Sequence, residues 1–322
     1  MRFRSYETTK YLCFFLALVC VYMLIGCKEK AIAEGSFDEI TYEVTASEDV
    51  TTVRDNTPLV LVPEALGTVT YGNDTVTIDA SNAGEGYIIV TYTGDNPKVK
   101  MQLKGPDKVT YTYNLQTQDA VIPITSGNGS YTATIFENID GSQYSTLFST
   151  DMDLAVTNTF GPYLYPNQYV NFNKDSAIVP KAKELAEGAT TDLEVVTAIY
   201  SYIVTNVTYD KEKFETAEKS YLPDVDEVLA SKRGFCFDYS ALMASMLRSQ
   251  RIPARMEIGY AGDVYHAWLS VYIDDVGWVS GIIQFNGTEW TLMDPTFAAN
   301  MGNSQLKSFI GNGSNYVTKY VY

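Results

Sequence analysis

Histidine is almost absent from this sequence, because only one, His266, occurs among 322 residues. Basic residues are scarce as well: 23 Lys and Arg stand against 39 Asp and Glu, and the formal net charge is −16. A nucleic-acid-binding protein needs a basic surface that neutralises phosphates, so we expect no nucleic acid among the partners. An acidic surface keeps an exported protein soluble, and the net charge by itself indicates no substrate.

The sequence also has no typical membrane span near its N-terminus. The uncharged and mostly apolar stretch Tyr11–Gly26 has sixteen residues, whereas a spanning helix needs about 20. Arg2, Arg4 and Lys10 precede this stretch. A basic segment followed by a short apolar segment predicts a secretory signal peptide.

The apolar stretch ends in Leu24-Ile25-Gly26-Cys27. This tetrapeptide resembles the bacterial lipobox, and the resemblance implies cleavage before Cys27 and attachment of a diacylglycerol to its sulfur. A plain signal peptide, or a membrane helix that happens to contain cysteine, is the alternative. We expect residues 1–26 to be a lipoprotein signal peptide and residues 27–39 a tether. The protein would then be extracytoplasmic, with Cys27 anchoring it to the bacterial cell membrane.

Cysteine is scarce too, and the four residues have different expected fates. Cys13 and Cys20 leave with the signal peptide and Cys27 is lipidated, so Cys236 is the one free thiol of the mature chain. An internal disulfide is then excluded. One thiol and one imidazole make no conventional zinc site, and no EF-hand-like calcium loop occurs, so we expect no metal and no cofactor. A leftover cysteine in an exported chain indicates a reactive thiol or an intermolecular bridge.

Residues 40–158 are rich in tyrosine, threonine and short β-like segments. Regular spacing and Gly-, Pro- and Asn-containing turns between the segments predict an all-β, sandwich-like domain. This region has neither histidine nor a free cysteine, so we expect a spacer or a binding module. The predicted strands are 87–92, 99–103, 110–115, 130–136 and 143–148.

A Pro-punctuated connector at residues 160–166 marks the expected start of a second domain, residues 159–322. Thr191-Asp192-Leu193-Glu194 is a capping box that opens a helix. A further helix begins at Cys236, with apolar residues at helical spacing on one face. Strands follow at 254–260 and 266–272, and a hairpin turns at Asn286-Gly287. The fold class expected for the chain is α+β.

Three residues of this second domain suit nucleophilic catalysis. A cysteine at a helix start, such as Cys236, lies where unpaired N–H groups and the helix dipole stabilise a thiolate. His266 is placed on a following strand and can exchange protons near neutral pH. Asp294, at the end of a later strand, could orient the imidazole. Taken singly, each residue is more often structural, but their combination favours a catalytic triad.

These residues stand in a longer pattern that resembles the transglutaminase-like superfamily, over roughly residues 165–300. The matching segments are Gly234-Phe235-Cys236-Phe237-Asp238-Tyr239-Ser240-Ala241-Leu242, Arg251-Ile252-Pro253-Ala254-Arg255, His266-Ala267-Trp268 and Asp294-Pro295-Thr296. The resemblance implies that Cys236, His266 and Asp294 are catalytic. It also implies a papain-like core, in which the cysteine helix packs on an antiparallel sheet that carries the histidine and the aspartate.

Two aromatic residues are further candidates. Members of the superfamily often add an upstream aromatic side chain to the oxyanion hole, and Tyr209 is the candidate here; packing is the alternative. Trp268 lies two residues after His266 and should face the same side of its strand. It would shield the thiolate–imidazolium pair, line the acyl cleft, or simply pack in the core.

The resemblance implies acyl transfer on peptide or glutamine-type amide bonds, through a thioester on Cys236. Water as acceptor gives a protease or amidase, and an amine gives crosslinking; we expect hydrolysis, because bacterial members are often hydrolytic. The expected partner is a protein or peptide substrate at the cell surface. The alternative is a non-catalytic binding or adhesion lipoprotein that uses the same scaffold.

Overall fold

The computed structural model describes residues 54–115, 119–218, 220–274, 277–280, 283–285, 290–292 and 316–322, which all belong to one compact unit. The predicted signal peptide, the tether and Cys27 lie outside these residues, as do Asp294 and the turn predicted at Asn286-Gly287. Within the described part of the chain, no helix has the length and apolar character needed to cross a membrane.

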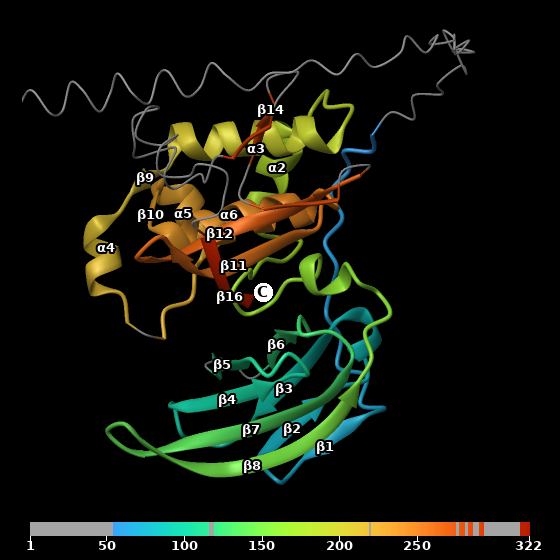
Figure 1. Ribbon diagram of the computed structural model, residues 1–322, viewed down its shortest axis with the longest axis vertical. Helices are drawn as coiled ribbons and strands as arrows, with labels where there is room; N and C mark the ends of the chain where they lie inside the picture. The colour runs from blue at the N-terminus through green and yellow to red at the C-terminus, as the bar shows by residue number, and fades with distance from the viewer. Residues whose placement is uncertain are drawn as a thin grey trace, which may run out of the picture. The chain divides into compact units, whose positions relative to one another are not determined.

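The N-terminal part of the described chain forms two four-stranded antiparallel sheets (Figure 1). Their buried side chains belong to one hydrophobic cluster, which is the arrangement expected of a sandwich-like region. The first sheet has the order β1 (Thr70–Gly72), β2 (Val76–Asp79), β3 (Tyr87–Tyr92), β6 (Asp119–Pro123). The second has the order β5 (Thr110–Asn114), β4 (Val99–Lys104), β7 (Gly129–Asp140), β8 (Gln143–Leu154).

Five of the eight strands described in this region correspond to predicted segments and differ from them mainly in length, whereas β1, β2 and β6 were not predicted. β3 has the predicted bounds, but β7 and β8 pair from Gly129 opposite Leu154 to Asp140 opposite Gln143, well beyond the predicted ends. Towards the tip of this hairpin the side chains are half-buried or exposed. Near the tip, the side chains no longer alternate between buried and exposed, although the backbone pairing continues. A prediction based on side-chain alternation therefore places the strand ends too early.

The helices follow the connector, and most agree with their local sequence signals. They are α2 (Ile178–Leu185), α3 (Asp192–Asn206), α4 (Lys211–Thr216), α5 (Val225–Ser231) and α6 (Cys236–Ser249). The capping box at Thr191 is confirmed: its hydroxyl accepts from the Glu194 N–H, and Glu194 accepts from the Thr191 N–H. The short helix α4 was not indicated by periodicity; it begins where Asp210 accepts a hydrogen bond from the Lys213 N–H.

Helix α6 packs on an antiparallel sheet of the order β13 (Gly277–Ser280), β12 (Val264–Ile273), β11 (Ala254–Ala261), β16 (Tyr316–Val321). A separate hairpin joins β14 (Ile283–Phe285) to β15 (Trp290–Leu292). The sequence predicts one apolar face for α6, but every residue of this helix except Phe237 is buried. Helices α2, α3 and α5 pack against it as well, so it is covered on several sides (Figure 1). The expected α+β core with a cysteine-bearing helix on an antiparallel sheet is confirmed.

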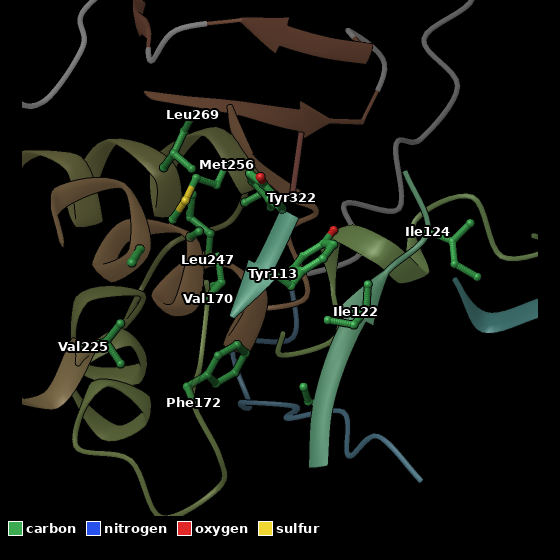
Figure 2. Packing of buried hydrophobic residues seen from close by; sticks show 14 of the residues in the cluster. Tyr113, Ile122, Ile124, Val170, Phe172, Val225, Leu247, Met256, Leu269 and Tyr322 are labelled. Atoms are coloured by element: carbon green, nitrogen blue, oxygen red, sulfur yellow. The ribbon is translucent and has the colours of Figure 1, made fainter. Parts of the chain in front are cut away.

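The strand-rich region and the helical core share buried residues. Figure 2 shows Tyr113 of β5 beside Tyr322, in the same cluster as Leu247 and Met256. The rings of Tyr113 and Tyr322 meet edge to face with centroids 6.0 Å apart. The predicted boundary between residues 158 and 159 stays a prediction, because the two regions belong to one compact unit.

Arg248 joins the C-terminal end of α6 to three other segments. Only 1% of this residue is exposed. Its guanidinium donates to the carbonyl of Ala254 at 2.9 and 3.1 Å, to that of Tyr165 at 2.7 Å, and to the main-chain oxygen of Tyr322 at 3.1 Å. Burial lowers the pKa of this group. Four hydrogen bonds to backbone dipoles are what makes the buried charge tolerable.

We expect Arg248→Met to lower the free energy of unfolding by roughly 3–5 kcal/mol, because the substitution removes four hydrogen bonds between the guanidinium and three main-chain oxygens. Urea unfolding followed by circular dichroism measures this. The matched control is Arg233→Met, since Arg233 forms an exposed ion pair with Asp210. That control should cost at most about 1 kcal/mol. Equal effects of the two substitutions would contradict the anchoring role.

Candidate active site

Cys236 is the first residue of α6 and is the free cysteine of the described residues. It is buried, with 7% of its surface exposed. The helix N-terminus offers N–H groups without intrahelical partners and the positive end of the helix dipole, and both favour an anion such as a thiolate. Cys236 therefore has the helix-start position that the sequence pattern predicts.

A two-residue parallel ladder brings Tyr209 to the start of this helix. β9 (Thr208–Tyr209) pairs with β10 (Arg233–Gly234), and Tyr209 lies opposite Gly234, two residues before the cysteine. Gly234 suits this tight turn because a Cβ there would lie 2.6 Å from the Cβ of Asp238. No hydrophobic period encodes such a short ladder, so only the folded chain shows that Tyr209 and Cys236 are neighbours.

The environment of Tyr209 keeps its hydroxyl protonated. Burial, and then the charge of the nearby Cys236, raise the pKa of Tyr209 to about 12. The half-buried ring packs against the small cluster of Phe235, Cys236 and Ala267. A phenol with this pKa is a hydrogen-bond donor throughout the neutral range. Tyr209 is thus a protonated neighbour of Cys236, although it is not among the described residues that line the cavity of Cys236 and His266.

His266 lies on β12, where it pairs with Gly259 of β11, and 4% of its surface is exposed. Trp268 faces the same side of the strand, as the alternation predicts, and its ring stacks with that of His266 at a centroid distance of 6.3 Å. Trp268 is itself buried and meets Tyr316 edge to face. It is absent from the described lining of the cleft, so it packs behind the imidazole.

Cys236 and His266 line the same cavity, which has a volume of about 330 Å³. The other described lining residues are aromatic, aliphatic or neutral polar: Thr112, Asn114, Tyr169, Phe214, Tyr221, Phe235, Phe237, Ile258, Tyr265, Ala267, Tyr320 and Tyr322. None of these side chains is charged at neutral pH. In a chain with a net charge of −16, a neutral cavity around the thiol avoids repulsion of the thiolate and suits an uncharged amide.

Asp238, two residues after the cysteine, is fully buried and fixes the local backbone. It accepts hydrogen bonds from the Phe235 N–H and from the Tyr221 hydroxyl, and Lys213 of α4 lies 3.3 Å from it. Burial raises the pKa of Asp238, although Tyr221, Phe235 and Lys213 oppose this. Burial alone would lower the pKa of Lys213, but Tyr221 and Asp238 outweigh it and raise that pKa. The network ties the cavity wall at Tyr221 to the start of α6.

The structure thus brings three of the predicted site residues together: Cys236, His266 and Tyr209. Asp294 lies outside the described residues, so its place in the triad stays a prediction, as does lipidation of Cys27. Sequence reasoning missed Asp238 and the aromatic wall. The position of Asp238 in the first turn of the helix could have predicted a capping role, because acidic residues there often cap the helix.

Comparisons with known proteins agree with the type of core. Residues 180–281 match the family model of the transglutaminase-like superfamily. An uncharacterized protein of Bacillus subtilis (strain 168), YebA, is 29% identical over 142 residues, which are 37% of this chain. The match covers 19% of that relative, so this chain spans about a fifth of its length.

Three solved structures are similar at low identity. A proposed cysteine protease from Cytophaga hutchinsonii is 18% identical with a TM-score of 0.34, and the match covers 73% of this chain and 76% of that chain. A proposed protease from Parabacteroides distasonis is 16% identical, with a TM-score of 0.28 and coverages of 58% and 38%. Red sea bream transglutaminase is 13% identical, with a TM-score of 0.28 and coverages of 65% and 48%.

If Tyr209 donates to the oxyanion, we expect Tyr209→Phe to lower the rate of acylation of Cys236 by roughly 100-fold, because the hydroxyl is lost while the ring packing is kept. The release of p-nitrophenolate from p-nitrophenyl acetate measures this step. Since the pKa of Tyr209 is raised to about 12, the hydroxyl stays protonated below pH 10. The ratio of wild type to variant should therefore stay constant from pH 6 to pH 10.

Tyr202→Phe on α3 is the matched control, since it removes a hydroxyl from another half-buried tyrosine. Its acylation rate should equal that of the wild type. A Tyr209→Phe variant with wild-type acylation would show that Tyr209 only packs.

Proposed function

Because residues 180–281 form a transglutaminase-like domain, we propose that this protein is a thiol-dependent acyl-transfer enzyme that acts on peptide or glutamine-type amide bonds. The observation that carries the proposal is the shared cavity: the thiol at the start of α6 and the imidazole of β12 open onto the same neutral, aromatic space. Cys236, His266 and Asp294 are the proposed triad, and Tyr209 is the proposed oxyanion donor.

The proposed reaction starts with transfer of the Cys236 proton to His266. The thiolate attacks the carbonyl carbon, and the oxyanion accepts hydrogen bonds from the Tyr209 hydroxyl and the Cys236 N–H. The C–N bond then breaks, and the imidazolium donates its proton to the leaving amine. The thioester is resolved by an acceptor that loses a proton to His266 as the C–S bond breaks and the thiol is restored. Asp294 would accept the other ring N–H and hold the imidazole in the required tautomer.

Water and an amine are both chemically competent acceptors. We favour water, hence a protease or amidase, because the resemblance to bacterial members of the superfamily implies it. The competing function is a non-catalytic binding or adhesion protein on the same scaffold. The sequence argues against it, because Cys236, His266 and Asp294 are all present, whereas a scaffold that had lost catalysis would tolerate their loss.

We also propose that the enzyme works outside the cytoplasm, anchored to the bacterial cell membrane through a lipid on Cys27. The support is the basic segment, the short apolar segment and Leu24-Ile25-Gly26-Cys27 in succession. A protein or peptide at the cell surface would then be the substrate.

The first test of the proposed function is the reactivity of the thiol. In the chain without residues 1–35, we expect Cys236 to react with iodoacetamide faster than free cysteine does at pH 6, because the helix start and an imidazolium favour the thiolate. We expect His266→Ala to slow the reaction at least about tenfold. Val264→Ala, an exposed position on the same strand, is the control and should have no effect.

The same proteins are then offered a peptide library with and without an added primary amine, and the products are identified by mass spectrometry. Wild type should convert peptides that Cys236→Ala leaves intact, and the products distinguish hydrolysis from amine transfer. The enzyme proposal fails if the thiol has ordinary reactivity that His266→Ala does not change and if no peptide is converted. The protein would then be a non-catalytic binding or adhesion protein on the same scaffold.

The anchor has its own test in a bacterial host. Cys27→Ser should abolish incorporation of radiolabelled palmitate and leave the precursor uncleaved or release the protein into the medium, because serine cannot form the thioether. Cys20→Ser is the matched control, since it lies in the predicted signal peptide. It should label normally. Normal labelling of Cys27→Ser would refute the assignment.

A further inference from the structure

A second cavity, of about 640 Å³, lies beside the cavity that contains the thiol. Thr112, Asn114 and Tyr169 line both cavities, so the two cavities are adjacent along these residues. Thr112 and Asn114 belong to β5, the edge strand of the second sheet. The strand-rich region therefore forms part of the wall of the site and continues it away from the thiol.

The register of the sheet places a lysine next to the shared wall. Asn114 of β5 lies directly opposite Lys100 of β4. Buried and less buried residues alternate along β4, and Lys100 is on the side that faces away from the core, as Asn114 is on β5. Neighbouring strands are about 4.8 Å apart. The base of the Lys100 side chain is thus one strand beyond a residue that lines the cavity of Cys236.

Lys98 and Lys100 both line the second cavity, and neither forms an ion pair with a carboxylate among the described residues. The Lys100 ammonium lies 4.5 Å from the centroid of the Tyr144 ring, which also lines this cavity. The ring limits the positions of the ammonium without neutralising it. Two lysines without an ion-pair partner among the described residues thus lie beside the site of a chain that has 23 basic and 39 acidic residues.

Glu218 is the one acidic residue in the described lining of the second cavity. It is exposed, and its carboxylate accepts a hydrogen bond from the Ser220 hydroxyl. Lys98, Lys100 and Glu218 together give this lining an excess of one positive charge. The two lysines lie at and just before the start of β4. The cavity around the thiol has no Asp, Glu, Lys or Arg in its described lining. The lining therefore changes from neutral to basic on going from the thiol, past the shared residues, into the second cavity.

We propose that the second cavity is a substrate subsite, in which Lys98 and Lys100 bind a carboxylate side chain of the same peptide whose amide bond reacts at Cys236. This inference rests on the proposed function, and it adds a preference for acidic peptides. An extended peptide advances about 3.3 Å per residue. The acidic residue is then two to four residues from the reacting amide, because the path crosses Thr112 and Asn114.

A peptide is the occupant that fits both ends of this path. The thiol end is neutral and aromatic, which suits an uncharged amide. At the other end Lys98 is exposed and Lys100 is half-buried, so a charged side chain there would keep much of its hydration. The strand-rich region then has a role in specificity.

The test uses N-acetyl hexapeptide amides that contain one Gln and, two to four residues before or after it, either Asp or the isosteric Asn. We expect wild type to prefer the Asp peptide by about threefold to tenfold in kcat/KM at one spacing, mainly through KM, as two exposed charge pairs would give. The preference should shrink as the salt concentration rises. In Lys98→Gln/Lys100→Gln it should vanish, with turnover of the Asn peptide unchanged.

Lys104→Gln is the matched control, because Lys104 is an exposed lysine of the same strand and lines neither cavity in the described residues. It should keep the preference, whereas Lys100→Glu should favour Asn over Asp. Equal use of Asp and Asn peptides by wild type at every spacing would overturn the subsite, and so would a preference that survives in the double variant.

Failure of the subsite and failure of the proposed function are separated by a binding measurement. Fluorescein-labelled Asp and Asn peptides are titrated with Cys236→Ala protein, with and without the two lysine substitutions, and anisotropy is recorded. If wild type shows no turnover but the lysines still determine which peptide binds, only the catalytic proposal fails. If turnover depends on Cys236 and binding is equal for both peptides, only the subsite fails.

Discussion

The arrangement of the site depends on how an almost fully buried helix is held, and Arg248 holds it through four hydrogen bonds to other segments. Helix α6 has almost no exposed surface, so its position is set by what its buried polar groups bind. Arg248 binds the start of β11, the connector before the helices and Tyr322 at the end of β16. Because a helix of this kind is rigid, fixing its C-terminal end also fixes the direction in which its N-terminal end, with Cys236, points.

The N-terminal end of α6 has a second set of restraints. The ladder between β9 and β10 brings in Tyr209, and Asp238 binds the Phe235 backbone, Tyr221 and Lys213. Both ends of the helix are therefore tied to the elements that form the cleft. The imidazole is held from the other side, on β12, with Trp268 stacked behind it. The thiol, the imidazole and the phenol come from three different elements, so they can meet only when all these restraints act together.

The distribution of charge connects the two regions of the chain functionally. The cavity around the thiol is neutral in its described lining, and its wall includes Thr112 and Asn114 of the strand-rich region. Next to this wall, Lys100 of β4 and Lys98, which precedes that strand, line the second cavity. If the proposed reaction takes place at this neutral cavity, the small basic surface beside it would let the enzyme select among peptides without changing the chemistry. The strand-rich region contributes directly to the wall of the cavity, so it is more than a spacer.

Local signals in the sequence were enough to identify the α+β class, the core of most strands, the capped helix at Thr191, and Cys236 at a helix start. They also indicated that Trp268 and His266 share one face of a strand, because alternation is a property of the strand itself. The family resemblance suggested Tyr209 as a neighbour of the thiol, but only the tertiary structure showed the ladder that brings it there. The tertiary structure alone decided that Asp238 is buried in a network, that Trp268 stacks with the imidazole, and that β5 forms part of the cleft. These features join residues far apart in the chain, and no local period encodes contacts that depend on how separate elements pack against one another.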